Sequence, residues 1–260
     1  MSAALEFRNV SVAIPSGRLL LDDVSLTLEG GTVTAILGRS GSGKTTLLRT
    51  ANRMIQTTRG QVNVAGVNVN ELGLVQLRRR IGYVIQETGL FPHFNVERNV
   101  GIVLEAEGES RQQRFSRSND LLHLVGLDPA VFSRRFPHQL SGGQRQRVGL
   151  ARALAAEPKI LLMDEPFGAL DPITRAEMQD MLRELLQRLH TTVLLVTHDL
   201  NEALYLADRI VLLDDSRVLA NLAHDEFLQS KQPEIVAYAS ASHRGQPSPA
   251  ADALAKDGCA

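Results

Sequence analysis

The sequence of 260 residues has one cysteine and no tryptophan, and aromatic residues make up only 4% of it. Because Cys259 has no second cysteine to pair with, an internal disulfide is excluded and we expect a reducing compartment. The chain also has no surplus charge of either sign, since 28 lysines and arginines balance 29 aspartates and glutamates. This balance argues against a general nucleic-acid-binding protein, which carries a basic surplus. Arginine-rich stretches at 78–80 and 111–117 are typical of solvated helix faces.

Long hydrophobic runs are lacking as well. No apolar stretch approaches the ~18 residues that a membrane-spanning helix needs. The N-terminus lacks the basic and then apolar pattern of a signal peptide. With 43% hydrophobic and 22% charged residues, the composition is still that of a globular protein with a sizeable core. We therefore expect a soluble, intracellular chain.

The apolar residues that are present follow the pattern of an α/β protein. Three short apolar runs indicate strands that are buried on both faces of a parallel sheet. They occupy 32–37, 160–163 and 192–197. Segments 5–14 and 62–69 alternate apolar and polar residues, which is typical of half-buried antiparallel strands, and helical patterns follow at 170–189 and 201–207. The sequence thus predicts a mainly parallel sheet covered by helices, with an N-terminal antiparallel layer.

One domain is expected over residues 1–239. Its middle part, about 87–157, shows helical segments without a buried-strand signal and separates two phosphate-site motifs that must meet in space. We interpret this part as a helical subdomain inserted into the core. In residues 240–260, 13 of 21 residues are Ala, Ser, Pro or Gly, a composition that predicts a flexible tail.

The strongest motif is GRSGSGKTT, which fits the phosphate-loop pattern G-x-x-x-x-G-K-[ST] and directly follows an apolar strand. Backbone N–H groups of such a loop surround phosphate oxygens, and glycines allow this close approach. We expect Lys44 to neutralise the β- and γ-phosphates during catalysis and Thr45 to complete a Mg²⁺ shell. The predicted nucleotide-binding residues of this loop are Gly38, Arg39, Ser40, Gly41, Ser42, Gly43, Lys44, Thr45 and Thr46.

Two carboxylates, Asp164 and Glu165, follow the apolar run at 160–163. Ligands of open α/β sheets bind at the carboxyl ends of strands, so this pair is expected beside the phosphate loop. Asp164 can reach the Mg²⁺, usually through water. Glu165 can orient and polarise a water for in-line attack on the γ-phosphate.

A second anion-binding motif comprises Ser141, Gly142, Gly143 and Gln144, at the start of a helical segment. A hydroxyl, backbone amides and the helix dipole are all directed outward at such a helix start. The alternative interpretation is an ordinary helix cap. Since the chain already has a complete phosphate loop, a second phosphate-binding surface requires another nucleotide.

With these motifs in this order, the sequence from about residue 5 to 228 resembles the ATP-binding subunits of ABC transporters. In that family two cassettes associate head to tail, and the signature of each covers the γ-phosphate bound by the other. The resemblance implies roles for Gln86 at the Mg²⁺ shell, Asp171 at the dimer interface and His198 at the γ-phosphate or the attacking water.

The resemblance also implies a fold, ligands and partners. The fold is the ABC ATPase fold, and the activity is that of a Mg²⁺-dependent ATPase of the translocase class, with ATP and Mg²⁺ as cofactors. The partners are a second ATPase subunit, expected to be another copy of this chain, an integral membrane permease and, indirectly, a solute-binding protein. The chain is expected to lie peripherally at the cytoplasmic face of the inner membrane.

The sequence departs from the family at the position where an aromatic residue commonly stacks on adenine, which is Ile14 here. An aliphatic side chain gives up ~1 kcal/mol of aromatic stacking, which affects base discrimination and ATP affinity but not hydrolysis.

Stretches 52–60 and 77–94 are similar to osmoprotectant importers, which carry glycine betaine, choline or carnitine, and 166–168 resembles importers more than exporters. Such relatives often add CBS domains; with about 30 residues after the cassette, we expect that regulation to be absent or elsewhere.

Alternatives remain open. The imported solute can be an amino acid or another small polar compound. A soluble ABC ATPase of translation or DNA repair usually has two cassettes or long inserts, and a non-hydrolysing switch would be expected to lose Glu165 or His198. The apolar cluster at 91–94 is either a permease contact or the small core of the insert.

Overall fold

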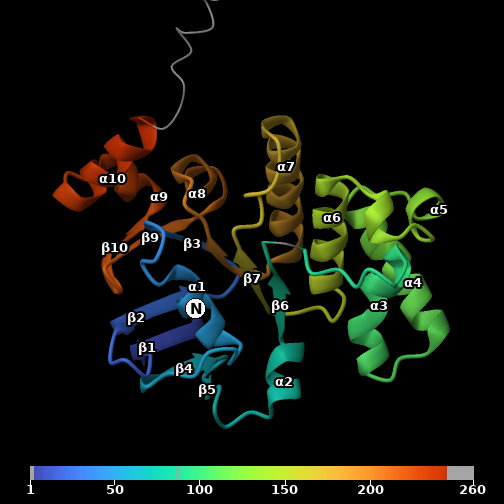
Figure 1. Ribbon diagram of the computed structural model, residues 1–260, viewed down its shortest axis with the longest axis horizontal. Coiled ribbons are helices and arrows are strands. Elements are labelled where there is room, and N and C mark those ends of the chain that lie inside the picture. Colours follow the sequence, from blue (N-terminus) through green and yellow to red (C-terminus); the bar gives the residue numbers. More distant parts are fainter. Residues whose placement is uncertain (1–2, 87, 245–260) are drawn as a thin grey trace, which may run out of the picture.

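The computed structural model describes residues 3–86 and 88–244 and contains two sheets (Figure 1). The larger sheet has the strand order β10-β9-β3-β8-β7-β6. Its strands are β3 (Val33–Leu37), β6 (Ile81–Val84), β7 (Ile160–Asp164), β8 (Thr192–Val196), β9 (Arg209–Asp214) and β10 (Arg217–Ala223). All neighbours pair in parallel except β9 and β10, which are antiparallel. The predicted parallel sheet is confirmed.

The second sheet is antiparallel and has the order β2-β1-β4-β5. It comprises β1 (Ala3–Ala13), β2 (Leu19–Glu29), β4 (Arg59–Val64) and β5 (Val67–Asn68). This sheet is the N-terminal layer that the alternating segments predicted. Figure 1 shows α1 (Lys44–Ala51) lying over this layer, and its buried Leu47 and Leu48 join the hydrophobic core between the two sheets.

Burial on both faces explains why the central strands are continuous apolar runs. Along β3, Ile36 contributes to the core that contains α1, whereas Ala35 and Leu37 contribute to the core on the opposite face. The side chains of Leu194 and Leu195 in β8 divide in the same way. Because successive side chains of a strand point to opposite faces, every position must be apolar when both faces are covered.

Residues 88–157 contain helices joined by loops and no strand among the residues that the structure describes. They form α3 (Val96–Ala106), α4 (Arg111–Leu124), α5 (Pro129–Phe132), the 3₁₀ helix η1 (Pro137–Gln139) and α6 (Gly142–Ala153). Helix α2 (Leu74–Arg79) precedes β6. In Figure 1 the helical unit α3–α6 lies to one side of the sheets, next to α7.

The last helices are α7 (Pro172–Leu189), α8 (Leu200–Leu206), α9 (His224–Gln229) and α10 (Pro233–Arg244). Helix α7 starts two residues later than its pattern predicted, because Asp171 caps it and Pro172 takes its first position. The predicted start of the tail at 240 is wrong, since α10 extends to Arg244; residues 245–260 lie outside the described part. Within the described chain, no helix is long and apolar enough to cross a membrane.

Candidate nucleotide site

The loop between β3 and α1 has the shape of a phosphate cradle. Gly43 caps α1 with a φ of 106°, and a Cβ atom there would lie 2.5 Å from the carbonyl oxygen of Leu20, so only glycine fits. The hydroxyl of Ser42 is buried and has no hydrogen-bond partner among the described residues. A buried, unpartnered hydroxyl at a helix N-terminus fits an anion that accepts hydrogen bonds from the loop.

Lys44 connects this loop to the acidic pair. Its buried ammonium donates to the carbonyl oxygens of Gly38 and Arg39, at 2.8 Å and 2.9 Å. Burial lowers the pKa of Lys44, while the nearby carboxylates of Glu165 and Asp164 counteract this shift. The predicted loop lysine and the predicted acidic residues therefore lie in one electrostatic site.

Thr45 and Asp164 form the candidate metal site. The Thr45 hydroxyl donates to Asp164 Oδ1 at 2.8 Å, so α1 meets the end of β7. The other carboxylate oxygen, Oδ2, accepts a hydrogen bond from the Tyr83 hydroxyl at 3.3 Å and lies 3.6 Å from the Arg49 guanidinium. The described residues contain no cluster of three or more His, Cys, Asp or Glu side chains that could hold a metal. One hydroxyl and one carboxylate beside a phosphate site fit Mg²⁺, which binds through few protein ligands and keeps several waters.

Glu165 and His198 form the second predicted pair. Oε2 of Glu165 lies 3.3 Å from Nδ1 of His198. Glu165 follows β7 and His198 follows β8, which are parallel neighbours, so their carboxyl ends lie side by side. The backbone N–H of Glu165 donates to the carbonyl of Val196 at 2.9 Å, which holds the carboxylate at this edge of the sheet. A carboxylate paired with an imidazole can orient a water and accept its proton.

Gln86 lies in the turn after β6, beside the same carboxylate. A Cβ atom on Gly168 would lie 3.6 Å from Nε2 of Gln86 and 3.7 Å from Oε2 of Glu165, so both side chains flank Gly168. The backbone just after Gln86 is bound by Arg152 of α6, which donates to the carbonyls of 88 and 89 at 2.6 Å and 2.8 Å. The segment that follows Gln86 is thus hydrogen-bonded to α6, the helix that begins at the Ser141 motif.

The signature residues cap α6. The Ser141 hydroxyl accepts from the backbone N–H of Gln144 at 3.2 Å, and the Gln144 side chain accepts from the N–H of Ser141 at 3.0 Å. A Cβ atom on Gly143 would lie 2.4 Å from the Thr174 methyl group, so the start of α6 contacts the first turn of α7. Asp171 caps α7 through the N–H of Thr174 at 3.1 Å, and hydrogen bonding with Thr174 lowers the pKa of Asp171.

The signature does not reach the phosphate loop of its own chain. Strands β8 and β7 separate β3 from the side of the sheet where the helical unit lies, and Figure 1 shows α6 beyond α7 as seen from α1. In the part of the chain that the structure describes, no hydrogen bond or ion pair joins 141–144 to 38–46. The structure therefore brings together the loop, the acidic pair, Gln86 and His198, but not the signature.

Ile14 lies at the end of β1, in the turn of the β1–β2 hairpin, and is 37% exposed. Its backbone N–H donates to the carbonyl of Arg18 at 3.0 Å, which closes the hairpin. The same hairpin contacts the phosphate loop, because the carbonyl of Leu20 faces Gly43. An accessible aliphatic side chain thus stands on the element that adjoins the loop.

The aromatic cluster at 91–94 lies on the surface of the helical unit. Phe91 is 41% exposed, and its ring centroid lies 5.3 Å from that of Phe94, which in turn lies 4.4 Å from the His93 ring. Buried Asn99 holds this loop, since its amide donates to the carbonyls of Phe91 and Phe94 at 3.1 Å and 3.0 Å. Other residues form the core of the unit, namely Val96, Val100, Leu104, Leu121, Leu122 and Val125. The interpretation of the cluster as the core of the insert is therefore wrong.

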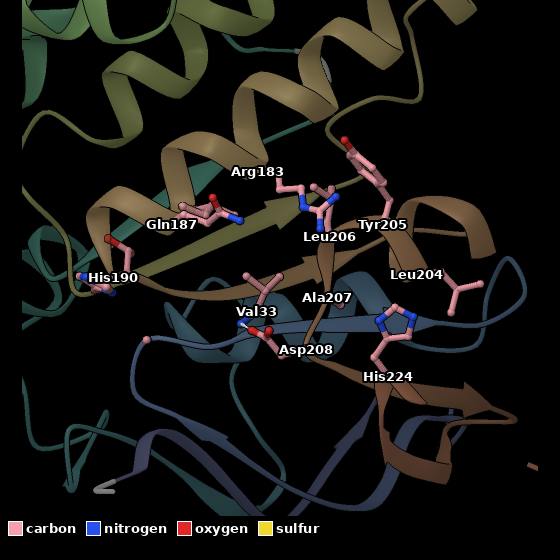
Figure 2. Close-up of a pocket in the computed structure, with 13 residues that line it drawn as sticks. Val33, Arg183, Gln187, His190, Leu204, Tyr205, Leu206, Ala207, Asp208 and His224 are labelled. Atoms are coloured by element: carbon pink, nitrogen blue, oxygen red, sulfur yellow. Dashed lines mark hydrogen bonds between the residues drawn. The ribbon is translucent and has the colours of Figure 1, made fainter. Parts of the chain in front are cut away.

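A separate cavity of about 610 Å³ lies between α7, α8 and the start of β3 (Figure 2). It is lined by Val33, Arg183, His190, Tyr205 and Asp208, among others. It contains none of the predicted site residues. Because Val33 and Asp208 stand at the amino ends of β3 and β9, this cavity lies at the edge of the sheet opposite the nucleotide site.

Two residues that contact Asp164, Arg49 and Tyr83, were not predicted. Arg49 lies four residues after Thr45 on α1, so helical spacing places both on one face and was the available signal. Tyr83 reaches Asp164 because β6 pairs with β7, with Tyr83 opposite Leu162. That pairing joins residues about 80 positions apart, and the sequence carried no signal for it.

Comparisons with known proteins agree with this geometry. A family model described as "ABC transporter" matches residues 21–168. The choline transport ATP-binding protein OpuBA of Bacillus subtilis (strain 168) is 44% identical over 232 residues, which cover 89% of this chain and 61% of that protein. The glycine betaine uptake system ATP-binding protein YehX of Escherichia coli (strain K12) is 44% identical over 83% of this chain and 69% of that protein.

Solved structures of ATP-binding cassettes have the same fold as this chain. The dimeric post-hydrolysis structure of the ATP-binding cassette MJ0796, bound to ADP and Pi, aligns with a TM-score of 0.76 and 34% identity. The alignment covers 85% of this chain and 98% of the cassette. By contrast, the chain spans less than two thirds of the length of OpuBA.

Proposed function

The chain belongs to the ABC transporter family, and on this premise we propose that it is the ATP-hydrolysing subunit that energises import of a quaternary-amine osmoprotectant through a separate permease. One observation carries the proposal: phosphate-binding, metal-binding and water-activating groups meet at the carboxyl ends of three neighbouring strands. These groups are Lys44, Thr45, Asp164, Glu165 and His198.

Each group has a distinct task in the proposed reaction. The loop amides and Lys44 bind and neutralise the β- and γ-phosphates. Thr45 and Asp164 hold Mg²⁺, which when bound neutralises charge on the phosphate oxygens. Glu165 orients and polarises the attacking water, and the imidazole of His198, 3.3 Å from Glu165, hydrogen-bonds the γ-phosphate or that water. Gln86 adds a contact at the metal shell.

We infer that the working unit is a head-to-tail pair of cassettes, expected to be two copies of this chain. The outward surface at Ser141 does not contact the phosphate loop of its own chain within the described residues, and Asp171 lies beside it at the start of α7. ATP held by one phosphate loop would be covered by the signature of the partner. The dimeric arrangement of the 34% identical cassette MJ0796 supports this proposal.

The proposed docking surface for the permease is the group formed by exposed Phe91 and His93 and half-buried Phe94. Exposed aromatic side chains are enriched at protein interfaces. Gln86 lies five residues before Phe91, and Arg152 fixes the backbone between them. A change at the γ-phosphate can therefore pass to the docked partner through a short, anchored segment.

The substrate class follows from the relatives. OpuBA is a choline transport protein and YehX belongs to a glycine betaine uptake system, and both compounds are quaternary amines. Substrate would reach the permease from a solute-binding protein, which acts on this chain only indirectly. This subunit would lie at the cytoplasmic face of the inner membrane.

The decisive experiment compares Glu165→Gln with Glu184→Gln, the same substitution at an exposed position of α7. Uptake of labelled glycine betaine is measured in cells that have lost their other betaine carriers, and ATP turnover is measured on the purified chains. We expect Glu165→Gln to abolish both and Glu184→Gln to leave both unchanged.

Two outcomes contradict different parts of the proposal. Undiminished ATP turnover in Glu165→Gln would exclude the role given to that carboxylate. Undiminished betaine uptake in Glu165→Gln, with turnover lost, would leave the ATPase standing and remove the quaternary-amine assignment.

A further inference from the structure

We propose that Tyr238 of α10 is a positioning residue for His198: its hydroxyl fixes the backbone of His198 and so the imidazole that faces Glu165. This inference rests on the proposed role of His198 in ATP hydrolysis. It assigns a task in the nucleotide site to the C-terminal helix, which carries none of the family motifs.

The backbone around His198 has one anchor at the residue itself. The residues before and after His198, Thr197 and Asp199, are joined by a hydrogen bond from the N–H of Asp199 to the Thr197 hydroxyl at 3.0 Å. The same hydroxyl donates to the buried carboxylate of Glu202 at 2.5 Å. The carbonyl of His198 accepts from the Tyr238 hydroxyl at 3.1 Å, and no other donor to it exists among the described residues. Without this hydrogen bond, the carbonyl would have only water as a partner.

Packing of α10 holds the Tyr238 ring in place. Ile235, almost one turn earlier, is 2% exposed and belongs to the main hydrophobic core, against which the Tyr238 ring packs. In Figure 1, α10 lies in the group formed by α8, α9 and β10. A narrow cavity of about 110 Å³ lies between α10 and the phosphate loop, lined by Gly38, Arg39 and Tyr238 among others.

The Tyr238 hydroxyl stays a donor at neutral pH. Burial raises the pKa of Tyr238 above its ordinary value of 10.0, although a hydrogen bond with the backbone of Gly38 counteracts this rise. The protonated hydroxyl therefore donates to the carbonyl of His198, and the Tyr238 side chain lines the same small cavity as Gly38, the first residue of the phosphate loop. Tyr238 thus lies next to the phosphate loop and is hydrogen-bonded to the backbone of His198.

The backbone anchor matters because the His198 side chain has little packing of its own. The side chain is 63% exposed, and its one polar partner among the described residues is Glu165. Its direction therefore depends on the backbone that carries it. Since catalysis requires close alignment of the imidazole with the reacting groups, a mobile backbone lowers kcat, whereas ATP binding by the loop is preserved.

The test uses the full chain with Tyr238→Phe, which removes the hydroxyl and keeps the packed ring. Tyr205→Phe is the matched control, because the hydroxyl of Tyr205 in α8 donates to Asp180 instead. We expect kcat of Tyr238→Phe to fall about threefold to tenfold, as loss of one hydrogen bond predicts, with KM for ATP within about twofold. The control is expected to match the wild type in both constants.

A second readout is independent of turnover. In protein with ¹⁵N-labelled histidine, the resonance that is missing in His198→Ala identifies the His198 imidazole. We expect this resonance to shift or broaden in Tyr238→Phe and to stay unchanged in Tyr205→Phe.

The inference is overturned if Tyr238→Phe retains both the wild-type kcat and the wild-type His198 resonance. It is also overturned if Tyr205→Phe loses as much kcat, because the effect would then not be specific to the His198 contact. Wild-type turnover in His198→Ala has a different meaning, because it would remove the proposed role of His198 itself. The Tyr238–His198 contact would still be tested by comparing the His198 resonance of the wild type with that of Tyr238→Phe.

Discussion

At the scale of single residues, one buried charge stands out next to the nucleotide site. Glu202 is 5% exposed, and its carboxylate accepts a hydrogen bond from the Thr197 hydroxyl at 2.5 Å. Nε of Arg175 lies 4.0 Å from the other carboxylate oxygen. Burial raises the pKa of Glu202 above its ordinary value of 4.5, the Thr197 hydrogen bond notwithstanding. The loop that carries His198 is therefore held by a carboxylate whose charged form is disfavoured by burial.

This cost predicts a pH-dependent stabilisation by Glu202→Gln, which keeps an oxygen acceptor for Thr197 and removes the charge. Because the pKa is raised on folding, protonated Glu202 favours the folded state, and this contribution is lost as pH rises through the folded-state pKa. We expect the variant to unfold on the order of a few degrees above the wild type at mildly alkaline pH. The difference should close as the pH approaches 4.5.

Thermal unfolding followed by circular dichroism over a pH series measures this difference. Glu184→Gln, at an exposed site, serves as the control and should track the wild type at every pH. If Glu202→Gln were less stable than the wild type at alkaline pH, the attraction between Glu202 and Arg175 would outweigh the free-energy cost of burying the carboxylate charge.

At the scale of elements, two helix starts lie together on a surface away from the phosphate loop of their own chain. Helix α6 begins at the Ser141 cap and α7 at the Asp171 cap, and the Gly143–Thr174 contact joins them. The Ser141 hydroxyl uses its oxygen to accept from Gln144, so its own proton remains available to an outside acceptor. An anion supplied by another chain is the acceptor that this arrangement suits.

Replacement of Ser141 by Arg tests this surface. A large side chain there blocks the approach of a partner nucleotide, so we expect ATP turnover to fall at least about a hundredfold. ATP affinity of the monomer should change by less than about threefold, because the phosphate loop is untouched. Turnover assays and isothermal titration calorimetry measure the two quantities.

Ser110→Arg supplies the control, since Ser110 caps α4 with the same reciprocal pair of hydrogen bonds to Gln113. Both substitutions remove a helix cap, which costs about 1 kcal/mol of stability in each case. If Ser110→Arg lost as much turnover as Ser141→Arg, the effect would come from lost stability and not from the signature surface.

At the scale of the whole molecule, the sheets and the helical unit hold the two halves of an ATP site on separate surfaces. One half, at the carboxyl ends of β3 and β7, contains the loop, the metal pair and Glu165, and the other half, at the start of α6, contains the signature. A single chain cannot fold one onto the other, because β7 and β8 stand between them. In the proposed head-to-tail pair, a second copy would supply the missing half and give two equivalent sites, as a closed two-fold dimer requires.

Glu165→Gln is therefore expected to form a stable dimer in saturating Mg-ATP, because ATP still bridges the chains and the water is no longer activated. Size-exclusion chromatography with light scattering should show a doubling of mass. The double variant Glu165→Gln/Ser141→Arg should remain monomeric, since the bridging surface is blocked. A monomeric Glu165→Gln variant in saturating Mg-ATP would contradict the head-to-tail pairing.

Features set by neighbouring residues were predictable from the sequence. Glycine spacing and the preceding strand define the loop at 38–46, and the apolar runs define β3, β7 and β8. The acidic pair at 164–165 was predicted from its position at a strand end, and His198 from the resemblance to ABC cassettes. The strands and the position of the loop formed as predicted because backbone conformation and face-by-face burial depend on residues close in the chain.

Contacts between distant segments were decided only by the tertiary structure. Helix α10 extends into a segment whose composition predicted a tail, because Ile235 and Tyr238 find a core to pack against. The Tyr83–Asp164 and Tyr238–His198 hydrogen bonds cross 81 and 40 residues, and each depends on an element that packing places beside the site. Local patterns thus identified the groups that we propose bind phosphate and activate water, whereas packing of distant elements determined how these groups are held.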